Sequence, residues 1–242
     1  MTPPLNGRAD LHMHTTVSDG RSTPEFMLEY AARWRQLDVL AITDHDRLDG
    51  SLWAFDQNGR YPFEIVPGVE VTSRDGHVLA LWVTRPIPMG LSLAETVAAI
   101  HEQGGVAVLA HPFELFISPR AVWRTLHQPQ YLLDSGIDAI EAFNAGALTP
   151  GGNLATQLRL GHLPLPVLGN SDAHMAASIA SGQTCFHGRS AQDLRDAIRS
   201  GWTRAEGHRW AITDYLKLCT PARTPKPIAS RATAASDRPT LP

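Results

Sequence analysis

Short apolar runs alternate with amphipathic stretches from about residue 9 to residue 210, and this alternation limits the possible folds more than any other feature. The expected strands are residues 9–14, 39–43, 65–72, 77–83, 106–110, 137–142 and 165–168. Strands separated by helices favour a parallel sheet, either open or closed into a barrel. A chain of 242 residues is long enough for one such α/β domain with a substantial core.

Three of the expected helices have recognisable starts. Thr23, Ser92 and Ser190 each precede an amphipathic stretch, and Glu95 completes a capping-box spacing with Ser92. Hydroxyl side chains at these positions accept hydrogen bonds from the first unpaired N–H groups of a helix. Gly201 supplies a stop for the last of these helices. We therefore expect helices to begin directly after the three hydroxyl residues.

Residues 219–242 differ in composition from the rest of the chain. They contain five prolines, four basic side chains and no aromatic residue. Such a segment buries too little apolar surface to offset the entropy lost on ordering, so we expect a disordered tail. The expected division is a folded domain of residues 1–210 and an extension of residues 211–242, with the tail starting at about residue 219. We expect the tail to have no function of its own, and the alternative is a weak contact between the tail and an anionic partner.

Charge, cysteine usage and hydropathy exclude several classes of protein. The net charge of −3 gives no support for a broad basic surface that binds nucleic acid. Two cysteines in the whole chain rule out a disulfide-stapled secreted scaffold. No apolar stretch approaches a membrane span, and the amino-terminal residues lack the apolar region of a signal peptide. A cytoplasmic location without membrane association is therefore the expectation.

The sequence has eleven histidines, and several of them follow expected strands together with acidic residues. Functional sites in parallel α/β folds form where the carboxyl ends of strands meet. The candidates at these ends are His12, His14, Asp19, His45, Glu70, His111, Asp172 and His174. Imidazole and carboxylate groups are metal ligands, and a buried cluster of them is costly without a metal. Their positions therefore predict a metal site.

Spacing alone leaves four further residues open. His77 begins an apolar run instead of ending one, and an antiparallel return strand would bring it near Glu70. It is equally well a ligand or an ordinary turn residue. Asp10, Asp44 and Asp46 either orient ligating imidazoles or serve as capping and surface residues.

Five short segments occur in a fixed order, namely DLHMHTTVSDG, AITDHD, GVEVTS, LAHP and GNSDAH. In this order and at these separations they resemble the motifs of the PHP (polymerase and histidinol phosphatase) superfamily. The resemblance extends from Asp10 to about Gly201. It implies a distorted (β/α)7 barrel that carries two or three divalent metal ions at the carboxyl ends of its strands. Mn²⁺, Fe²⁺ and Zn²⁺ all suit the nitrogen and oxygen ligands available.

The resemblance also assigns roles to individual residues, and it makes His77 a ligand. The metal ligands that it implies are His12, His14, Asp19, His45, Glu70, His77, His111, Asp172 and His174. Glu70 would bridge two metals, and Glu70, Asp172 and His174 are the predicted catalytic residues. All nine positions hold acceptable ligands, which argues against an inactive structural module.

The compact motif arrangement is most similar to the stand-alone metal-dependent phosphoesterases. These include a nucleoside 3′,5′-bisphosphate phosphatase and a 5′-to-3′ exoribonuclease. Only about forty residues separate Glu70 from His111, so we expect no large helical lid and a less enclosed pocket. The expected reaction is hydrolysis of phosphate monoesters of a small metabolite or nucleotide by a metal-bound hydroxide. Arg120 and Arg47 are the predicted substrate-binding residues.

Two other interpretations stay open. A 5′-to-3′ exonuclease acting on short oligonucleotides would require a basic groove with aromatic stacking platforms. A non-catalytic interaction module would keep the metal for stability alone. The expected partners are a small phosphorylated substrate, a nucleotide or a short oligonucleotide, and no strong protein partner is implied.

Overall fold

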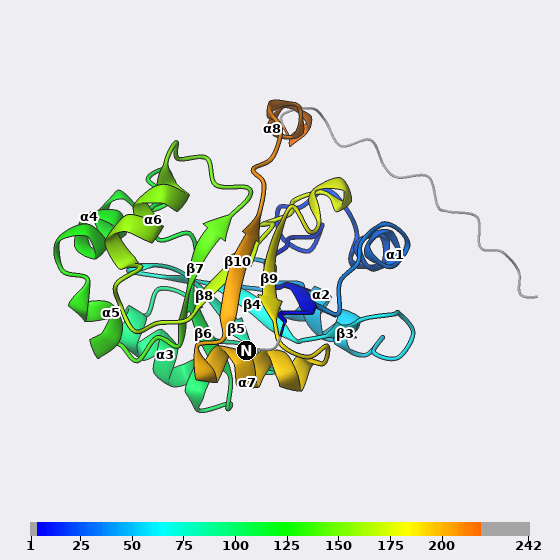
Figure 1. The fold of residues 1–242 in the computed structure, drawn as a ribbon, viewed down its shortest axis with the longest axis horizontal. Helices are drawn as coiled ribbons and strands as arrows, with labels where there is room; N and C mark the ends of the chain where they lie inside the picture. The colour runs from blue at the N-terminus through cyan, green and yellow to red at the C-terminus, as the bar shows by residue number, and fades with distance from the viewer. Residues whose placement is uncertain (1–3, 219–242) are drawn as a thin grey trace, which may run out of the picture.

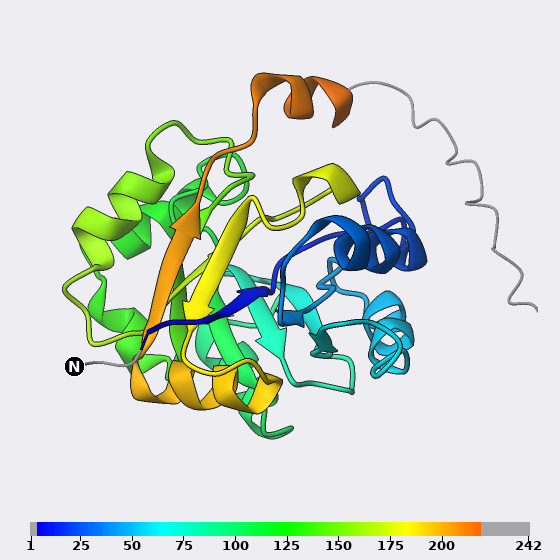
Figure 2. The same ribbon diagram turned by 45° about the vertical axis from the view of Figure 1, so that its right-hand side comes forward.

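The computed structural model describes residues 4–218, which form two five-stranded sheets with helices around them (Figure 1 and Figure 2). The first sheet has the order β10 (Thr203–Gly207), β9 (Gly182–Phe186), β1 (Gly7–Asp10), β2 (Val39–Leu40) and β3 (Glu64–Ile65). The second has the order β4 (Gly68–Ser73), β5 (Gly76–Leu81), β6 (Val106–Leu109), β7 (Ala139–Asn144) and β8 (Val167–Asn170). The predicted α/β class is confirmed.

The two sheets approach each other at the carboxyl ends of their parallel strands. β5 and β9 run antiparallel to their neighbours, whereas the pairs β1–β2, β2–β3, β6–β7 and β7–β8 are parallel. Two isolated parallel bridges link the sheets: one joins His45, after β2, to Glu70 of β4, and the other joins Met13, after β1, to Ala173, after β8. Within residues 4–218 the strands do not pair into one closed ring, so the predicted (β/α)7 barrel is not confirmed.

Helices cover the outer faces and both ends of the sheets (Figure 1). The helices are α1 (Pro24–Trp34), α2 (Asp49–Phe55), α3 (Leu93–His101), α4 (Pro119–His127), α5 (Gln130–Asp134), α6 (Gly152–Leu160), α7 (Ala191–Ser200) and α8 (Ile212–Leu218), with a 3₁₀ turn at Ala176–Ser178. α7 lies across the amino ends of the strands, and α8 lies at the opposite end, beyond β10 (Figure 2). Among residues 4–218, no helix combines the length and apolarity needed to cross a membrane.

The expected helix starts are present. Thr23, Ser92 and Ser190 each accept a hydrogen bond from a backbone N–H in the first turn of α1, α3 and α7. α7 ends at Ser200 and is capped by Gly201, whose φ of 74° is in the left-handed region that glycine adopts without strain. Local capping chemistry therefore fixed these three boundaries.

The expected strand at 65–72 is two strands in different sheets. Pro67 lies between them, and because proline has no N–H to donate, the ladder breaks there. β3 pairs with β2, while β4 pairs with β5. β9 and β10 were not predicted from the sequence; all five residues of β10 are exposed or half-buried and give no apolar alternation. The predicted disordered tail lies outside the described residues.

Alternation within the second sheet directs polar side chains into the space between the sheets. Val69 and Val71 of β4 pack in the cluster formed with α3, α5 and α6. Glu70 lies between them, so its side chain points to the other face and is fully buried there. Leu79 and Leu81 of β5 belong to the separate cluster between the sheets. The site thus lies directly above an apolar core.

Candidate metal centre

The structure brings all nine predicted ligand residues into one cluster at the carboxyl ends of the strands. Their ligand atoms form four overlapping groups, each with all its atoms within 4.8 Å of one another. The groups are His14, Asp19, His45 and His174; His12, His14 and Glu70; His12, His111 and Asp172; and His45, Glu70 and His77. Shared members connect every group to another, as expected of a centre that holds more than one ion.

The inner part of the cluster is almost completely shielded from solvent, with only Asp172 partly exposed, at 14% of its side chain. The Nε2 atoms of His12 and His14 are 3.1 Å apart, and each lies 3.2 Å from Glu70 Oε2. Asp172 Oδ1 completes this group at 3.4 Å from His12 Nε2 and 3.2 Å from His14 Nε2. The side chains of His12, His14 and Glu70 have no exposed surface. Two imidazole nitrogens and two carboxylate oxygens thus converge on one small volume.

Three buried polar atoms in this cluster have no hydrogen-bond partner. They are Glu70 Oε2, Asp172 Oδ1 and His14 Nδ1. Leaving a buried polar atom unpaired costs about 1–3 kcal/mol, and more for a charged group. Divalent cations satisfy such acceptors. The donor set, with imidazole and carboxylate groups and no thiolate, therefore fits Mn²⁺, Fe²⁺ or Zn²⁺.

The outer part of the cluster is open to solvent. Asp19 is 53% exposed, and its Oδ2 lies 3.1 Å from His174 Nε2 and 3.7 Å from His45 Nε2. His77 and His111 are not part of this open side: their side chains are only 11% and 6% exposed, and they lie on the other side of Glu70, with Nδ1 and Nε2 at 2.8 and 3.0 Å from Glu70 Oε1. Both oxygens of Glu70 therefore face imidazoles, the arrangement that a carboxylate bridging two ions requires.

The His77 geometry settles a question of position that spacing left open. β5 is antiparallel to β4, with His77 opposite Thr72. The return strand therefore begins at the end of β4 that carries the cluster and places the His77 ring against Glu70. Whether His77 binds metal stays a prediction.

Mutual electrostatics keep the central carboxylates ionised. Burial alone raises the pKa of Glu70, but the imidazoles of His12, His77 and His111 hold it well below its usual range. The pKa of Asp172 is likewise held well below its usual range against burial, with His12 as the largest opposing influence. Burial lowers the pKa of His45, which favours the neutral imidazole that a metal requires.

Glu141 orients the innermost ligand, and sequence analysis assigned it no role. Its side chain is buried on β7, and Oε1 lies 2.9 Å from His12 Nδ1. It also accepts hydrogen bonds from the His111 backbone N–H and from the side-chain amides of Asn144 and Asn170. A carboxylate on Nδ1 favours the tautomer that leaves Nε2 free toward the cluster. The sequence feature that could have identified Glu141 is its position as the single acidic residue in an apolar strand.

Asp10, Asp44 and Asp46 hold the backbone around the site. Asp10 accepts hydrogen bonds from the N–H groups of Ser171 and Ala180, and burial raises its pKa to about 6. Asp44 accepts from the Thr15 N–H and hydroxyl, and Asp46 accepts from a backbone N–H of β4. These bonds fix loops and strand ends and do not reach imidazoles.

Three of the five non-glycine residues with positive φ in the described part of the chain lie at or beside the site, and the other two are Trp82 and Ala180. His111, Asp172 and Asp46 have φ values of 25°, 53° and 52°. Non-glycine residues adopt this left-handed region at an energetic cost, and such residues cluster at functional sites. Two of the three are predicted ligands, so the fold tolerates strain in order to aim them.

A cavity of about 430 Å³ opens over the cluster. It is lined by Asp19, Arg21, His45, Glu70, His77, His111, Glu114, Ile117, Gly146, Ala147, Leu148, Asp172, His174, Trp210, Tyr215 and Leu218. No large lid is inserted between Glu70 and His111, where the structure has β5 and α3, as expected. The segment that contains Trp210 and α8 nevertheless borders this pocket. From the sequence, this segment was expected to lie at the end of the folded domain of residues 1–210 or in the extension that follows it.

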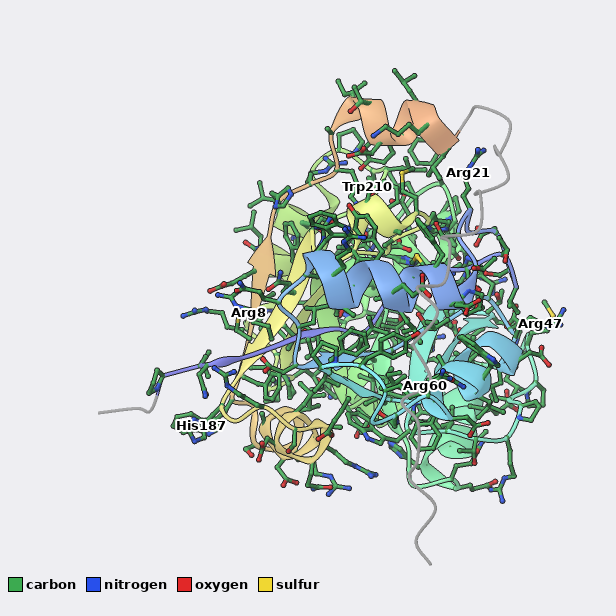
Figure 3. The ribbon with its side chains drawn as sticks, turned by 90° about the vertical axis from the view of Figure 1, so that its right-hand side faces the viewer. Arg8, Arg21, Arg47, Arg60, His187 and Trp210 are labelled. Carbon is green, nitrogen blue, oxygen red and sulfur yellow. The ribbon has the colours of Figure 1, made fainter. Side chains whose placement is uncertain are left out.

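The two predicted substrate-binding arginines are not among the cavity-lining residues. Arg47 forms an exposed ion pair with Asp49 at 2.8 Å, and Arg120 is exposed at the start of α4. Figure 3 shows Arg47 beside α2 and His187 at the α7 end, whereas Arg21 and Trp210 lie toward α8. Arg21 is the arginine that lines the cavity, and its guanidinium donates to the Leu218 carbonyl. No short sequence motif had identified Arg21 as a residue of the site.

Comparisons with known proteins agree with this geometry. The PHP-associated family model matches residues 159–203. The uncharacterized protein MJ1587 of Methanocaldococcus jannaschii is 33% identical over 149 residues, which are 57% of this chain and 82% of that protein. The 3′,5′-nucleoside bisphosphate phosphatase of Chromobacterium violaceum is 30% identical over 159 residues, which are 59% of this chain and 55% of that protein.

A solved structure has the same fold. It is a two-domain protein from Bacteroides vulgatus that contains a predicted PHP-like metal-dependent phosphoesterase. The TM-score is 0.66 at 21% identity, and the match covers 86% of this chain and 68% of the other. At this identity the similarity concerns the fold alone.

Proposed function

The chain belongs to the PHP superfamily, and on that premise we propose that it is a metal-dependent phosphoesterase that hydrolyses phosphate monoesters of a small metabolite or nucleotide. The two sheets would correspond to an opened form of the family's distorted (β/α)7 barrel. Residues 1–210 would form the catalytic domain, and residues 211–218 would add one border of its cavity.

One observation carries the proposal. Glu70 and Asp172 are surrounded by imidazoles that lower their pKa values, and each has one buried oxygen, Oε2 and Oδ1, that faces the same point without a hydrogen-bond partner. A structural histidine cluster would have its acceptors paired within the protein. Acceptors that converge without partners at the base of a cavity support a site that binds two or three divalent ions. The nine predicted ligands would hold them.

Bound divalent ions supply two things to phosphoester hydrolysis, namely activation of water near neutral pH and neutralisation of phosphoryl charge. The residues of the chain do the rest. Glu141 fixes the tautomer of His12, and the Asp172 carbonyl, 2.9 Å from His174 Nδ1, does the same for His174. Each ring therefore presents Nε2 to the cluster. Burial excludes bulk water from Glu70, which strengthens every interaction around it.

The test is a turnover screen of protein loaded with Mn²⁺ and of measured metal content. The substrates are nucleoside bisphosphates, sugar phosphates and short RNAs, and phosphate or nucleotide release is measured. We expect release of inorganic phosphate from at least one monoester, abolished by a chelator and restored by Mn²⁺. Glu70→Gln protein purified in parallel excludes a contaminating phosphatase.

The outcomes separate the competing interpretations. Stepwise release of nucleotides from RNA without monoester hydrolysis would favour the exonuclease. No turnover of any substrate at full metal occupancy would contradict the proposal and favour a non-catalytic module.

A further inference from the structure

The cavity over the cluster has two chemically different walls. One consists of the carboxylates and imidazoles described above. The other is apolar and consists of Ile117, Gly146, Ala147, Leu148, Trp210, Tyr215 and Leu218. Nothing in the proposed hydrolysis of a phosphate group uses this second wall, so its role is a separate question.

The apolar wall is assembled from three distant segments and fixed to the strand ends that carry the cluster. The Trp210 backbone N–H donates to the Ala145 carbonyl at 3.0 Å, and the Trp210 indole N–H donates to the Ser171 carbonyl at 3.1 Å. The Tyr215 hydroxyl donates to the Ala147 carbonyl at 3.3 Å. Ser171 directly precedes Asp172. These bonds hold the wall in a fixed position relative to the metal ligands.

The outer part of this wall leaves large apolar side chains in solvent. Leu148 is 56% exposed and Ile117 is 44% exposed. Trp210 is only 7% exposed, and its ring supports that of Tyr215 at a centroid distance of 5.3 Å. A backed aromatic ring beside exposed aliphatic side chains at a cavity mouth is typical of a surface that receives an apolar group.

Two charged residues near this wall, Arg21 and Glu114, contact the backbone of the protein. Among the cavity-lining residues that the structure describes, Arg21 is the only arginine or lysine, and it contacts the carbonyl of Leu218 at the end of α8. Glu114 accepts hydrogen bonds from the N–H groups of Leu148 and Thr149 at 2.7 and 3.0 Å. Apart from the predicted metal ligands, Arg21 and Glu114 are the only charged residues among the described lining residues, so the rest of this wall suits an uncharged group.

We propose that Ile117, Leu148 and Tyr215 form a subsite for an uncharged, apolar ring in the organic part of the phosphoester. This inference rests on the proposed function and narrows its substrate class. The ring lies against the apolar wall while the phosphate faces the metal ligands. The segment that contains Trp210 and α8 is thereby part of the substrate site.

Two synthetic esters test the subsite with matched chemistry. 2-Phenylethyl phosphate and ethyl phosphate both release a primary alcohol and differ by the ring. We expect kcat/KM of the wild-type protein to be at least about tenfold higher for the phenylethyl ester, as partial burial of a ring implies. Leu148→Ser and Tyr215→Ala should lower this ratio toward one. Leu158→Ser, which changes a 71% exposed leucine outside the cavity, should leave the ratio unchanged.

Binding of 2-phenylethanol, followed by saturation-transfer NMR, gives a readout that does not depend on turnover. Wild-type and Leu158→Ser proteins should show transfer to the ring protons, and Leu148→Ser should lose it. Equal kcat/KM for the two esters, or equal transfer in all variants, would overturn the subsite even if both esters are hydrolysed. Ring binding without hydrolysis of either ester would contradict the proposed function and leave the subsite supported.

Discussion

His12 and Asp19 belong to the same cluster, but their surroundings have little in common. The His12 ring is fully buried, and Glu141 holds its Nδ1 at 2.9 Å. The Asp19 carboxylate is 53% exposed on a loop, and its contacts are nearby imidazoles and the hydroxyl of Ser18. The inner half of the site is therefore built into strand ends, whereas the outer rim consists of loop residues that solvent reaches. We expect the inner half to determine whether metal binds, and the rim to adjust how tightly.

Glu70→Gln should have the largest effect, because it removes a charge from the centre of the inner half. We expect kcat to fall by about 10²–10³-fold or more, since the neutral amide no longer balances the ions and imidazoles around it. Activity is measured at known metal content and the fold by circular dichroism. Glu102→Gln, an exposed residue at the end of α3, is the matched control. Near-normal turnover by Glu70→Gln would remove Glu70 from the bridging role.

Glu141→Gln tests whether the inner half depends on an orienting carboxylate that touches no metal. The amide keeps the shape but weakens the hold on the His12 tautomer, so we expect metal affinity to fall about 10–100-fold. Competition against a fluorescent chelator measures the affinity. Glu206→Gln, on the edge strand β10, should not change it. If both variants bind metal equally well, Glu141 has a purely structural role.

Removing metal should destabilise the whole fold, since the unpaired acceptors lie in the inner half. At free metal of 100 times Kd the bound ion adds about 2.7 kcal/mol, which corresponds to roughly 5–10 °C in Tm. Thermal unfolding with chelator or with Mn²⁺ measures this difference. A Tm that does not respond to metal would mean that the cluster is satisfied without one.

The metal-free and metal-loaded proteins should differ in how stability depends on pH. Burial alone lowers the pKa of His14, but Asp172 and Glu70 raise it to about 9. In the unfolded chain the pKa of His14 is 6.5. The protonated ring therefore stabilises the metal-free fold fully at pH values below 6.5, and this stabilisation is lost as the pH rises toward 9. Denaturant unfolding between pH 6.5 and 9 should show declining stability without metal. An equal decline with metal bound would show that His14 is not a ligand.

Asp19→Asn should have the smallest effect, because its carboxylate is largely in solvent. We expect metal affinity to fall by roughly threefold to tenfold at one ion, with the other ions retained. Metal stoichiometry by elemental analysis and affinity by chelator competition measure this. Loss of all metal in this variant would contradict the division into inner half and rim.

The positions of the cluster residues were predictable because they depend on local rules. Parallel strands bring their carboxyl ends together, so His12, His45, His111 and His174 were expected to meet, and they do. Capping chemistry likewise marked the start of α7 at Ser190. Both inferences use neighbours in sequence or a general property of the fold class.

The features that were missed depend on contacts between distant residues. Trp210 and Tyr215 reach the cavity because the chain after β10 returns across the open end of the site, where the end of α8 meets Arg21. Pro67 moved the chain from one sheet to the other, which a continuous apolar run concealed. Glu141 could have been found, since one acid inside an otherwise buried strand needs a partner.

The central claim is that the cluster is a multinuclear metal centre, and anomalous X-ray diffraction tests it most directly. Crystals grown with Mn²⁺ are measured above and below the manganese absorption edge. We predict at least two anomalous peaks within coordination distance of the nine residues, with Glu70 contacting both. Crystals in which manganese is absent from this cluster at saturating metal, or is found only elsewhere, would contradict the account.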